Sequence, residues 1–336
     1  MQIIENQSLT SYNTFGIKAK SRYFVEAHSE EALLYALQSN IQPIFILGGG
    51  SNILLTQDFD GLVIKNSIAG KGVVEINENQ ALVRFGAGEN WHQTVLWTLA
   101  QGFGGLENLS LIPGTVGASP LQNIGAYGVE LKDVFHHLEA MERKTGNIHI
   151  FDKIACQFGY RESIFKKELK DKYIITRIYL QLTTTHHKIN VSYGAIQDVL
   201  GAKAIENPTI QDVSDAVIAI RSSKLPDPTK IGNAGSFFKN PEISQTQFDI
   251  LQQQFLTIPA FPGEKGGIKV PAGWLIEQCG WKGTRRGDAG CYDKQALVLV
   301  NYGNAKGGEI WQLAMDIVRS VEQKFDIRLS PEVNVI

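Results

Sequence analysis

A glycine-rich stretch at residues 112–128 carries the clearest chemical information in this sequence. It holds four glycines and two prolines and no charged side chain. Glycine reaches positive φ at little cost and lets the backbone come close to a ligand. Loops of this kind hold phosphate or pyrophosphate through main-chain N–H groups. We therefore predict an anion-binding loop. The alternative is a purely structural loop, although loops this long usually carry function.

The standard nucleotide-binding motifs are absent from the sequence. The dinucleotide fingerprint G-x-G-x-x-G fails at each candidate, because its last position is Ile53, Trp91 or Glu107. No G-x-x-x-x-G-K-[ST] phosphate loop occurs either. A second glycine cluster, residues 48–52, lies about 60 residues before the first. Two such clusters could hold one extended ligand from two domains.

The composition limits the class of protein. The 336 residues suffice for two or three domains. A formal net charge of −2 gives no bulk electrostatic attraction to nucleic acid or to an anionic membrane. The first residues lack the pattern of a signal peptide, and no apolar run reaches membrane-spanning length. We expect a cytosolic monomer without nucleic-acid or membrane partners.

The cysteines and histidines do not indicate a metal site. The three cysteines show no C-x-x-C spacing, which favours reduced thiols over disulfides or metal ligands. The adjacent pairs His136–His137 and His186–His187 should point to opposite sides if they lie on strands. Neither pair would then chelate a metal, and we expect none.

The hydrophobic patterns predict an α+β fold. Predicted strands cover residues 22–27, 43–47, 62–64, 73–77, 81–85, 136–141, 147–151, 173–183 and 296–301. Predicted helices cover residues 29–39 with Ser29 as the N-cap, a segment that begins after Asn90 and stops before Gly102, a segment that begins at residues 209–212, and residues 244–255 and 308–325.

The chain resembles the UDP-N-acetylenolpyruvoylglucosamine reductases, flavoenzymes of bacterial peptidoglycan synthesis, over essentially its whole length. The segments that carry the resemblance, all in the family's order, are 12–15, 48–52, 112–128, 159–163, 221–226, 232–241 and 331–333. The segment near Tyr193 and the chain length resemble the longer type I branch, in which a tyrosine loop covers the substrate. The replacement of Ala-Pro by Ser119-Pro120 is a mild departure from the family pattern, and the charged stretch 262–270 has no evident role.

The resemblance implies a three-domain α+β flavoprotein. Residues 1–69 and 70–223 would form two FAD-binding subdomains of the vanillyl-alcohol-oxidase (PCMH) type. Residues 224–336 would form an α+β substrate-binding domain whose C-terminal tail returns to the active site. The implied reaction uses NADPH to reduce FAD and then transfers a hydride to the enolpyruvyl ether of a UDP-sugar, giving UDP-N-acetylmuramate.

The resemblance also implies binding residues. The FAD contacts expected are Gly48, Gly49, Gly50, Ser51, Asn52, Thr115, Gly117, Ala118, Gln122, Asn123, Gly125, Gly128 and Arg221. The contacts expected for the enolpyruvyl UDP-sugar are Tyr193, Lys224, Asn240 and Gln295. Neither glycine cluster contains His or Cys, which favours non-covalent FAD over the tethered flavin of the alternative, an alcohol or sugar oxidase of the same superfamily.

Three catalytic residues follow from the same resemblance. Arg161 would bind the substrate carboxylate and Glu332 would help to stabilise the enolate, while Ser236 would donate the proton. Without the resemblance, each has an ordinary alternative role, as a surface ion pair, a solvated carboxylate or a turn residue. A catalytically inactive nucleotide-binding protein is a further alternative, which the presence of all three residues disfavours.

Overall fold

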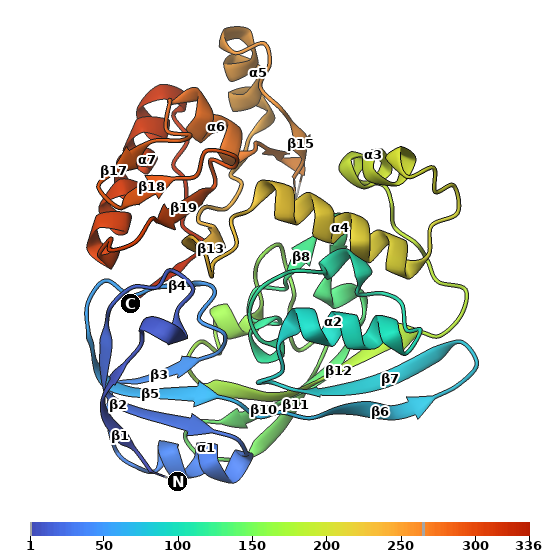
Figure 1. The fold of residues 1–336 in the computed structure, drawn as a ribbon, viewed down its shortest axis with the longest axis vertical. Helices are drawn as coiled ribbons and strands as arrows, with labels where there is room; N and C mark the ends of the chain where they lie inside the picture. The colour runs from blue at the N-terminus through green and yellow to red at the C-terminus, as the bar shows by residue number, and fades with distance from the viewer. Residues whose placement is uncertain (1, 264–265) are drawn as a thin grey trace. The chain divides into compact units, whose positions relative to one another are not determined.

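The computed structural model describes residues 2–263 and 266–336 (Figure 1). Its internal contacts divide the chain into two compact units. The first unit comprises residues 2–6, 22–49 and 60–223, and the second comprises residues 7–21, 50–59 and 224–336. Within the glycine cluster 48–52, Gly48 and Gly49 therefore belong to the first unit, and residues 50–52 belong to the second. The three-domain division with bounds at 69/70 and 223/224 stays a prediction.

A four-stranded sheet with one covering helix opens the first unit. The strand order is β1 (Ile4–Ser8), β2 (Lys20–Ala27), β5 (Phe59–Asn66) and β3 (Ile44–Leu47), and β3 runs parallel to β5. Helix α1 (Glu30–Leu37) begins at Ser29, whose hydroxyl accepts a hydrogen bond from the Ala32 N–H at 3.2 Å. Its buried Leu33 packs with Leu62 and Ile64 of β5. The predicted β-α-β unit is confirmed.

An antiparallel sheet of five strands forms the larger part of the first unit. Its order is β11 (Ile148–Asp152), β10 (Phe135–Glu142), β12 (Tyr173–Thr183), β7 (Gln80–Gly86) and β6 (Lys71–Ile76). Helix α2 (Trp91–Ala100) lies over this sheet and packs Val95 and Leu99 into its core (Figure 1). Its Asn90 cap and the positive φ at Gly102 confirm the predicted bounds. Edge strand β6 carries a bulge between Val73 and Glu75.

Two helices complete the first unit. Helix α4 (Ile210–Lys224) packs its predicted apolar face against helix α3 (Gly194–Ala202), which the sequence analysis missed. Ile196 and Leu200 of α3 meet Val213 and Val217 of α4. The apolar face of α3 has only these two fully buried positions, so its sequence pattern is weak.

The second unit surrounds a sheet with the order β13 (Gly232–Ser236), β19 (Val298–Asn301), β18 (Ala289–Cys291) and β17 (Arg285–Arg286). Helices α5 (Gln245–Gln254), α6 (Ala272–Gln278) and α7 (Gly307–Phe325) pack around it through Phe255, Trp274 and Phe325. Two small sheets join β14 (Glu242–Ile243), β16 (Ile268–Lys269) and β15 (Phe261–Pro262), and β20 (Asn334–Val335) with β4 (Ile53–Leu54). Residues 264–265 of the stretch 262–270 lie outside the described residues.

One predicted side-chain direction is wrong. The Nδ1 atoms of His136 and His137 lie 2.6 Å apart instead of pointing to opposite sides of β10. The register of β10 against β12 shifts between Phe135 and His137, and this irregularity breaks the strict alternation. His137 also stacks on Tyr179 of the neighbouring strand, with ring centroids 4.0 Å apart. In the described residues, no group of three or more His, Cys, Asp or Glu side chains could hold a metal ion.

Candidate functional site

Part of the first glycine cluster packs directly on the 112–128 loop within the first unit. A Cβ added to Gly49 would lie 2.7 Å from Gly114 Cα, and one added to Gly48 would lie 2.8 Å from Thr115 Oγ1. Such distances leave no room for a side chain. Residues 65 and 67 positions apart in the sequence thus form one surface.

The middle of the loop is fixed against the residues that precede α2. The Gly117 N–H donates to Ala87 O at 2.8 Å, and a Cβ at Gly117 would lie 2.5 Å from Ala87 Cβ. The Trp91 N–H donates to Gly114 O at 3.0 Å. Ala118 closes a short 3-10 turn by donating its N–H to Thr115 O at 3.1 Å. The loop therefore has a defined shape before any ligand binds.

Several backbone N–H groups of both glycine segments have no acceptor in the part of the chain that the structure describes. In the first unit they belong to Gly49, Gly114 and Thr115, and in the second unit to Gly50 and Ser51. Successive N–H groups without protein acceptors form an anion-binding concavity. Because no acidic side chain belongs to either segment, the N–H groups of Gly49, Gly114 and Thr115 within the first unit fit a pyrophosphate group such as that of FAD.

The end of the loop is locked by Asn123, whose φ is +41°. Its side-chain amide donates to Glu130 Oε2 at 3.0 Å and to Gly159 O at 3.1 Å, while its oxygen accepts from the Lys132 N–H at 3.0 Å. The hydrogen-bonding capacity of this side chain is therefore largely used within the protein. Its backbone N–H is used as well, since it donates to Pro120 O at 3.3 Å, so Asn123 mainly shapes the loop.

Arg161 lies against the same end of the loop. Its Nη2 donates to Gly125 O at 2.6 Å, and its own φ of +55° is in the left-handed region. A non-glycine residue at positive φ is uncommon and often marks a functional constraint. The guanidinium also lies 5.5 Å from the Tyr160 ring centroid.

A second guanidinium lies in the electrostatic field of the first. Burial lowers the pKa of Arg221, the electrostatic interaction with Tyr127 opposes this, and the charge of Arg161 lowers the pKa further. Among the described residues, Arg221 forms no ion pair with a carboxylate. Burial and the Arg221 charge also lower the pKa of His92, whose neutral Nδ1 accepts from the Leu111 N–H at 3.0 Å. This part of the first unit suits an anionic group.

Tyr127 is a site residue that the sequence analysis missed. It lies between Gly125 and Gly128 with a φ of +50° and interacts electrostatically with Arg221. Its ring meets the predicted substrate residue Tyr193 edge-on, with centroids 5.0 Å apart. Tyr193 stands at the start of α3 and is 48% exposed, so a ligand can reach it. The signal in the sequence was an aromatic residue inside a glycine loop.

In the second unit, Ser236 ends strand β13 beside a bulge. The register against β19 shifts between Asn233 and Ser236, and Gly235 takes a φ of +68°. The Gly235 N–H donates to Asn233 Oδ1 at 3.0 Å, which fixes the bulge. The Ser236 side chain is exposed and has no hydrogen-bond partner among the described residues. A bulge that redirects a side chain is common next to active sites.

Glu332 is paired with the segment that follows Ser236. Its N–H donates to Phe237 O at 2.8 Å, and the Lys239 N–H donates to Ser330 O at 3.0 Å. The half-buried Glu332 thus lies next to the strand end that carries Ser236. Asn52 of the first glycine cluster contacts the same residue, since its Nδ2 donates to Glu332 O at 3.3 Å.

The other predicted substrate residues of the second unit fall into two places. Asn240 accepts the Ala272 N–H at 3.0 Å through its Oδ1, at the start of α6. Gln295 Oε1 lies 3.1 Å from a Cβ built on Gly273 of the same helix and accepts the Leu297 N–H at 3.3 Å. Lys224 is exposed at the last residue of α4.

Three predicted cofactor contacts have other neighbours. Gly50 takes a φ of +65°, and a Cβ there would collide with the Tyr12 carbonyl oxygen. Gly128 accepts a hydrogen bond at 3.2 Å from the Asn190 side chain through its carbonyl. Gln122 is half-buried and lies within the first unit.

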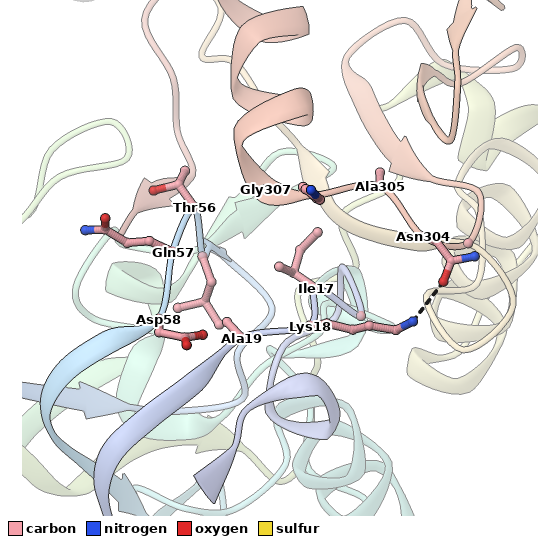
Figure 2. A pocket seen from close by; sticks show the side chains of 13 residues that line it. Ile17, Lys18, Ala19, Thr56, Gln57, Asp58, Asn304, Ala305 and Gly307 are labelled. Carbon is pink, nitrogen blue, oxygen red and sulfur yellow. Dashed lines mark hydrogen bonds between the residues drawn. The ribbon is translucent and has the colours of Figure 1, made fainter. Parts of the chain in front are cut away.

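A pocket of the second unit contains none of the predicted residues. It has a volume of about 360 Å³ and is lined by residues 16–19, 55–58 and 303–307 (Figure 2). Lys18 crosses its rim and donates to Asn304 Oδ1 at 2.9 Å. No helix within the described residues is both long enough and apolar enough to cross a bilayer.

Comparison with known proteins places this geometry in a family. Residues 21–152 match the model of an FAD binding domain, and residues 227–336 match that of the UDP-N-acetylenolpyruvoylglucosamine reductase C-terminal domain. The fold is similar to that of the UDP-N-acetylenolpyruvylglucosamine reductase from Thermus caldophilus, with a TM-score of 0.67, 24% identity, and 99% of this chain and 98% of that chain covered. The predicted fold class, an α+β flavoprotein with a PCMH-type FAD-binding part, and the FAD cofactor are confirmed.

Full-length relatives share close to half of the sequence. The UDP-N-acetylenolpyruvoylglucosamine reductase of Flavobacterium johnsoniae is 51% identical, and that of Amoebophilus asiaticus is 49% identical, with 100% of both chains covered in each case. The Pseudomonas aeruginosa enzyme of the same name is 46% identical, covering 100% of this chain and 99% of that one. The chain therefore belongs to the UDP-N-acetylenolpyruvoylglucosamine reductase family.

Proposed function

We propose that this protein uses FAD and NADPH to reduce enolpyruvyl-UDP-N-acetylglucosamine to UDP-N-acetylmuramate, a step of bacterial peptidoglycan precursor synthesis. The observation that carries the proposal is the pairing of Glu332 with Phe237, which brings a carboxyl group beside the strand end that holds the exposed Ser236. A proton donor and an enolate-stabilising carboxyl on paired segments suit the addition of a proton next to a carboxylate.

FAD would be held by the backbone of both glycine segments. The unused N–H groups of Gly49, Gly114 and Thr115 within the first unit suit its pyrophosphate. When bound, FAD supplies the two-electron chemistry, accepting a hydride from NADPH and passing it to the methylene carbon of the enolpyruvyl group. The locked side chain of Asn123 keeps the loop in the shape that this binding needs.

Ser236 supplies the proton that completes the reaction. Hydride addition to the methylene carbon moves the electron pair of the C=C bond toward the carboxylate and gives an enolate. The neighbouring carbon then takes the proton of the Ser236 hydroxyl, so the π bond is replaced by two new C–H bonds while the C–C single bond remains, and Ser236 regains its proton from water. A serine hydroxyl is a weak acid, but the enolate carbon is a strong base. Positive φ at Gly235 and the bulge of β13 keep this hydroxyl exposed.

Arg161 and Glu332 stabilise the negative charge that develops on the substrate carboxylate. A guanidinium remains charged at all relevant pH values and can bind a carboxylate through two hydrogen bonds. Its hydrogen bond to Gly125 O and its left-handed backbone hold Arg161 in one orientation. Glu332 acts in its protonated form, because only a carboxylic acid can donate a hydrogen bond to the enolate.

Four residues bind the UDP-sugar in this proposal. Lys224 offers a point charge to the pyrophosphate, Asn240 and Gln295 offer amides near the start of α6, and exposed Tyr193 covers the substrate. Arg221 adds positive charge in the first unit.

Anaerobic flavin spectroscopy tests the function in two stages. The FAD-loaded protein should lose its yellow absorbance when NADPH is added and recover it when enolpyruvyl-UDP-N-acetylglucosamine follows. Reoxidation by oxygen alone, with no response to the UDP-sugar, would instead favour an oxidase of the same flavoprotein superfamily. Absence of bleaching by NADPH would remove the proposed reductant.

A further inference from the structure

The segment Ser330–Ile336, called here the tail strap, is hydrogen-bonded on both sides within the second unit. From its chemistry we infer that Thr56 is a positioning residue for Glu332 and acts through this strap. The inference rests on the proposed role of Glu332. It adds a residue that touches neither the substrate nor the cofactor in the proposed function.

The first half of the tail strap is tied to the segment that carries Ser236. Ser330 accepts from Lys239, Pro331 lies opposite Phe238 in an isolated antiparallel bridge, and Glu332 donates to Phe237. These contacts hold the backbone of Glu332 and fix where it lies along residues 237–239.

The second half of the tail strap is tied to residues 52–56. The Asn334 N–H and its Nδ2 both donate to Asn52 O at 3.0 Å, and the Ile336 N–H donates to Leu54 O at 2.9 Å. Strand β20 thus runs parallel to β4 for two residues only. Because this pairing has so few hydrogen bonds, each of them contributes a large part of the stability of the paired tail strap.

Thr56 lies at the end of this ladder and donates two hydrogen bonds to a single acceptor, Ile336 O. Its N–H reaches Ile336 O at 2.7 Å and its Oγ1 reaches the same oxygen at 2.9 Å. Segment 54–56 is itself fixed, because Leu54 and Leu55 are buried and Gly307 at the start of α7 approaches the Leu55 carbonyl too closely for a side chain. Figure 2 shows Thr56 on the side of the pocket opposite Asn304, with Gly307 between them along the upper wall. A fixed Thr56 therefore provides a firm anchor for the far end of the strap.

The consequence is a specific kinetic signature. The isosteric variant Thr56→Val keeps the backbone rung and loses only the hydroxyl rung. We expect the protection of the tail-strap amides from hydrogen exchange to fall about 3- to 10-fold, which corresponds to the loss of one ordinary intramolecular hydrogen bond. Glu332 would then sample positions away from the enolate. Reduction of the flavin by NADPH does not need Glu332, so it should be unchanged.

The experiment compares FAD-loaded wild type, Thr56→Val, Thr56→Ser and the control Thr246→Val. Thr246 is an exposed residue of α5 without a hydrogen-bonded hydroxyl among the described residues. Stopped-flow absorbance measures each half-reaction separately, and amide hydrogen exchange measures protection of Asn334 and Ile336. The inference expects faster exchange at both amides and a 3- to 10-fold slower flavin reoxidation by the UDP-sugar in Thr56→Val alone, with recovery in Thr56→Ser.

Three outcomes overturn the inference. One is faster exchange with unchanged reoxidation, which would separate strap order from Glu332 chemistry. Another is an equal slowing of both half-reactions, which would indicate a general structural defect. The third is a failure of Thr56→Ser to restore the rate. If wild type itself is not reoxidised by the UDP-sugar, the proposed function fails, and the exchange result still reports whether Thr56 holds the strap.

Discussion

The side-chain amide of Asn52 donates a hydrogen bond to the backbone carbonyl of Glu332 at 3.3 Å. Asn52 belongs to the first glycine cluster and Glu332 to the last seven residues of the sequence, yet both lie in the second unit. A residue expected to contact the cofactor therefore also holds the backbone of a residue expected to contact the substrate. Substitution of Asn52 would disturb both functions at once, which makes other positions better tests of each.

Replacement of Ser236 by Ala should separate the two half-reactions. Flavin reduction by NADPH should proceed at the wild-type rate, because no proton from Ser236 enters that step. Reoxidation by the UDP-sugar should slow by about 10²- to 10⁴-fold, the usual contribution of a positioned general acid. Single-turnover absorbance measurements report both rates.

A serine of similar exposure provides the control. Ser244 accepts the Gln247 N–H at 3.1 Å and is the N-cap of α5. Its replacement by Ala should lower the free energy of unfolding by about 1 kcal/mol and leave both half-reactions unchanged. If Ser236→Ala slowed flavin reduction as strongly as reoxidation, Ser236 could not be the proton donor.

Lys224 should contribute to binding of the UDP-sugar and not to the proton transfer. A charged hydrogen bond to a phosphate oxygen is worth about 1.5–3 kcal/mol, so Lys224→Gln should raise KM about 10- to 100-fold with little change in kcat. Exposed Lys230 of the same unit offers a matched control in Lys230→Gln. Equal effects of the two variants on KM would point to net charge alone. A fall in kcat with constant KM would contradict the binding role.

Two glycines of equal backbone conformation should differ in their tolerance of a methyl group. Gly16 and Gly50 have φ values of +66° and +65°. A Cβ at Gly16 has open space around it, so Gly16→Ala should cost only the left-handed strain, about 1–2 kcal/mol. At Gly50 the Cβ meets the Tyr12 carbonyl, so Gly50→Ala should cost about 1–3 kcal/mol more. Urea unfolding of the apoprotein measures the free energy of unfolding of each variant. Equal losses in the two variants would show that the Tyr12 carbonyl moves aside at little cost.

The buried thiols should make the fold sensitive to alkaline pH. Burial, with a smaller effect from Asp152, raises the pKa of Cys156 to about 12 from an ordinary value of 9.0, and burial raises that of Cys291 to about 12 as well. Above pH 9 the unfolded chain loses these protons while the folded chain keeps them. The free energy of unfolding therefore falls as pH rises from about 9 to 12, at roughly 1.4 kcal/mol per pH unit for each thiol.

Variant Cys156→Ala isolates one of these contributions. Its free energy of unfolding should fall less steeply with pH than that of wild type over the same window. The buried truncation Val298→Ala should lower stability at every pH and keep the wild-type slope. Identical slopes for wild type and Cys156→Ala would mean that the Cys156 thiol ionises in the folded state as readily as in the unfolded state.

Local sequence patterns predicted the regular elements well. Helix α7 follows from a single apolar stripe, and α1 follows from the Ser29 cap, because both signals depend only on nearby residues. The resemblance implied a tail that returns to the active site, but its two-residue pairing with β4 was not predicted, since a hydrogen bond between Asn334 and Asn52 joins residues more than 280 positions apart. The facing rings of His136 and His137 depend on a bulge, which leaves no mark in the alternation of residue types.

The candidate site, too, was predicted where the signal is local and missed where it depends on distant residues. Glycines that carry no side chain marked both segments expected to bind the cofactor, and the close approach of Gly49 to Gly114 leaves no room there for any other residue. The roles of Arg161, Ser236 and Glu332 came from resemblance, since an arginine, a serine and a glutamate alone do not specify a reaction. Tyr127 went unnoticed because its partnership with Arg221 joins residues from a loop and a distant helix.

The bulge in edge strand β6 bears on how this protein avoids aggregation. An edge strand offers unpaired N–H and C=O groups to any other extended chain, and Val73, Val74 and Ile76 are exposed there. The register break between Val73 and Glu75 interrupts the regular spacing of those groups, and the Glu75 charge would be desolvated by a docked strand. A short irregularity in a hairpin far along the sequence from the proposed catalytic residues thus discourages the sheet from extending into a neighbouring molecule.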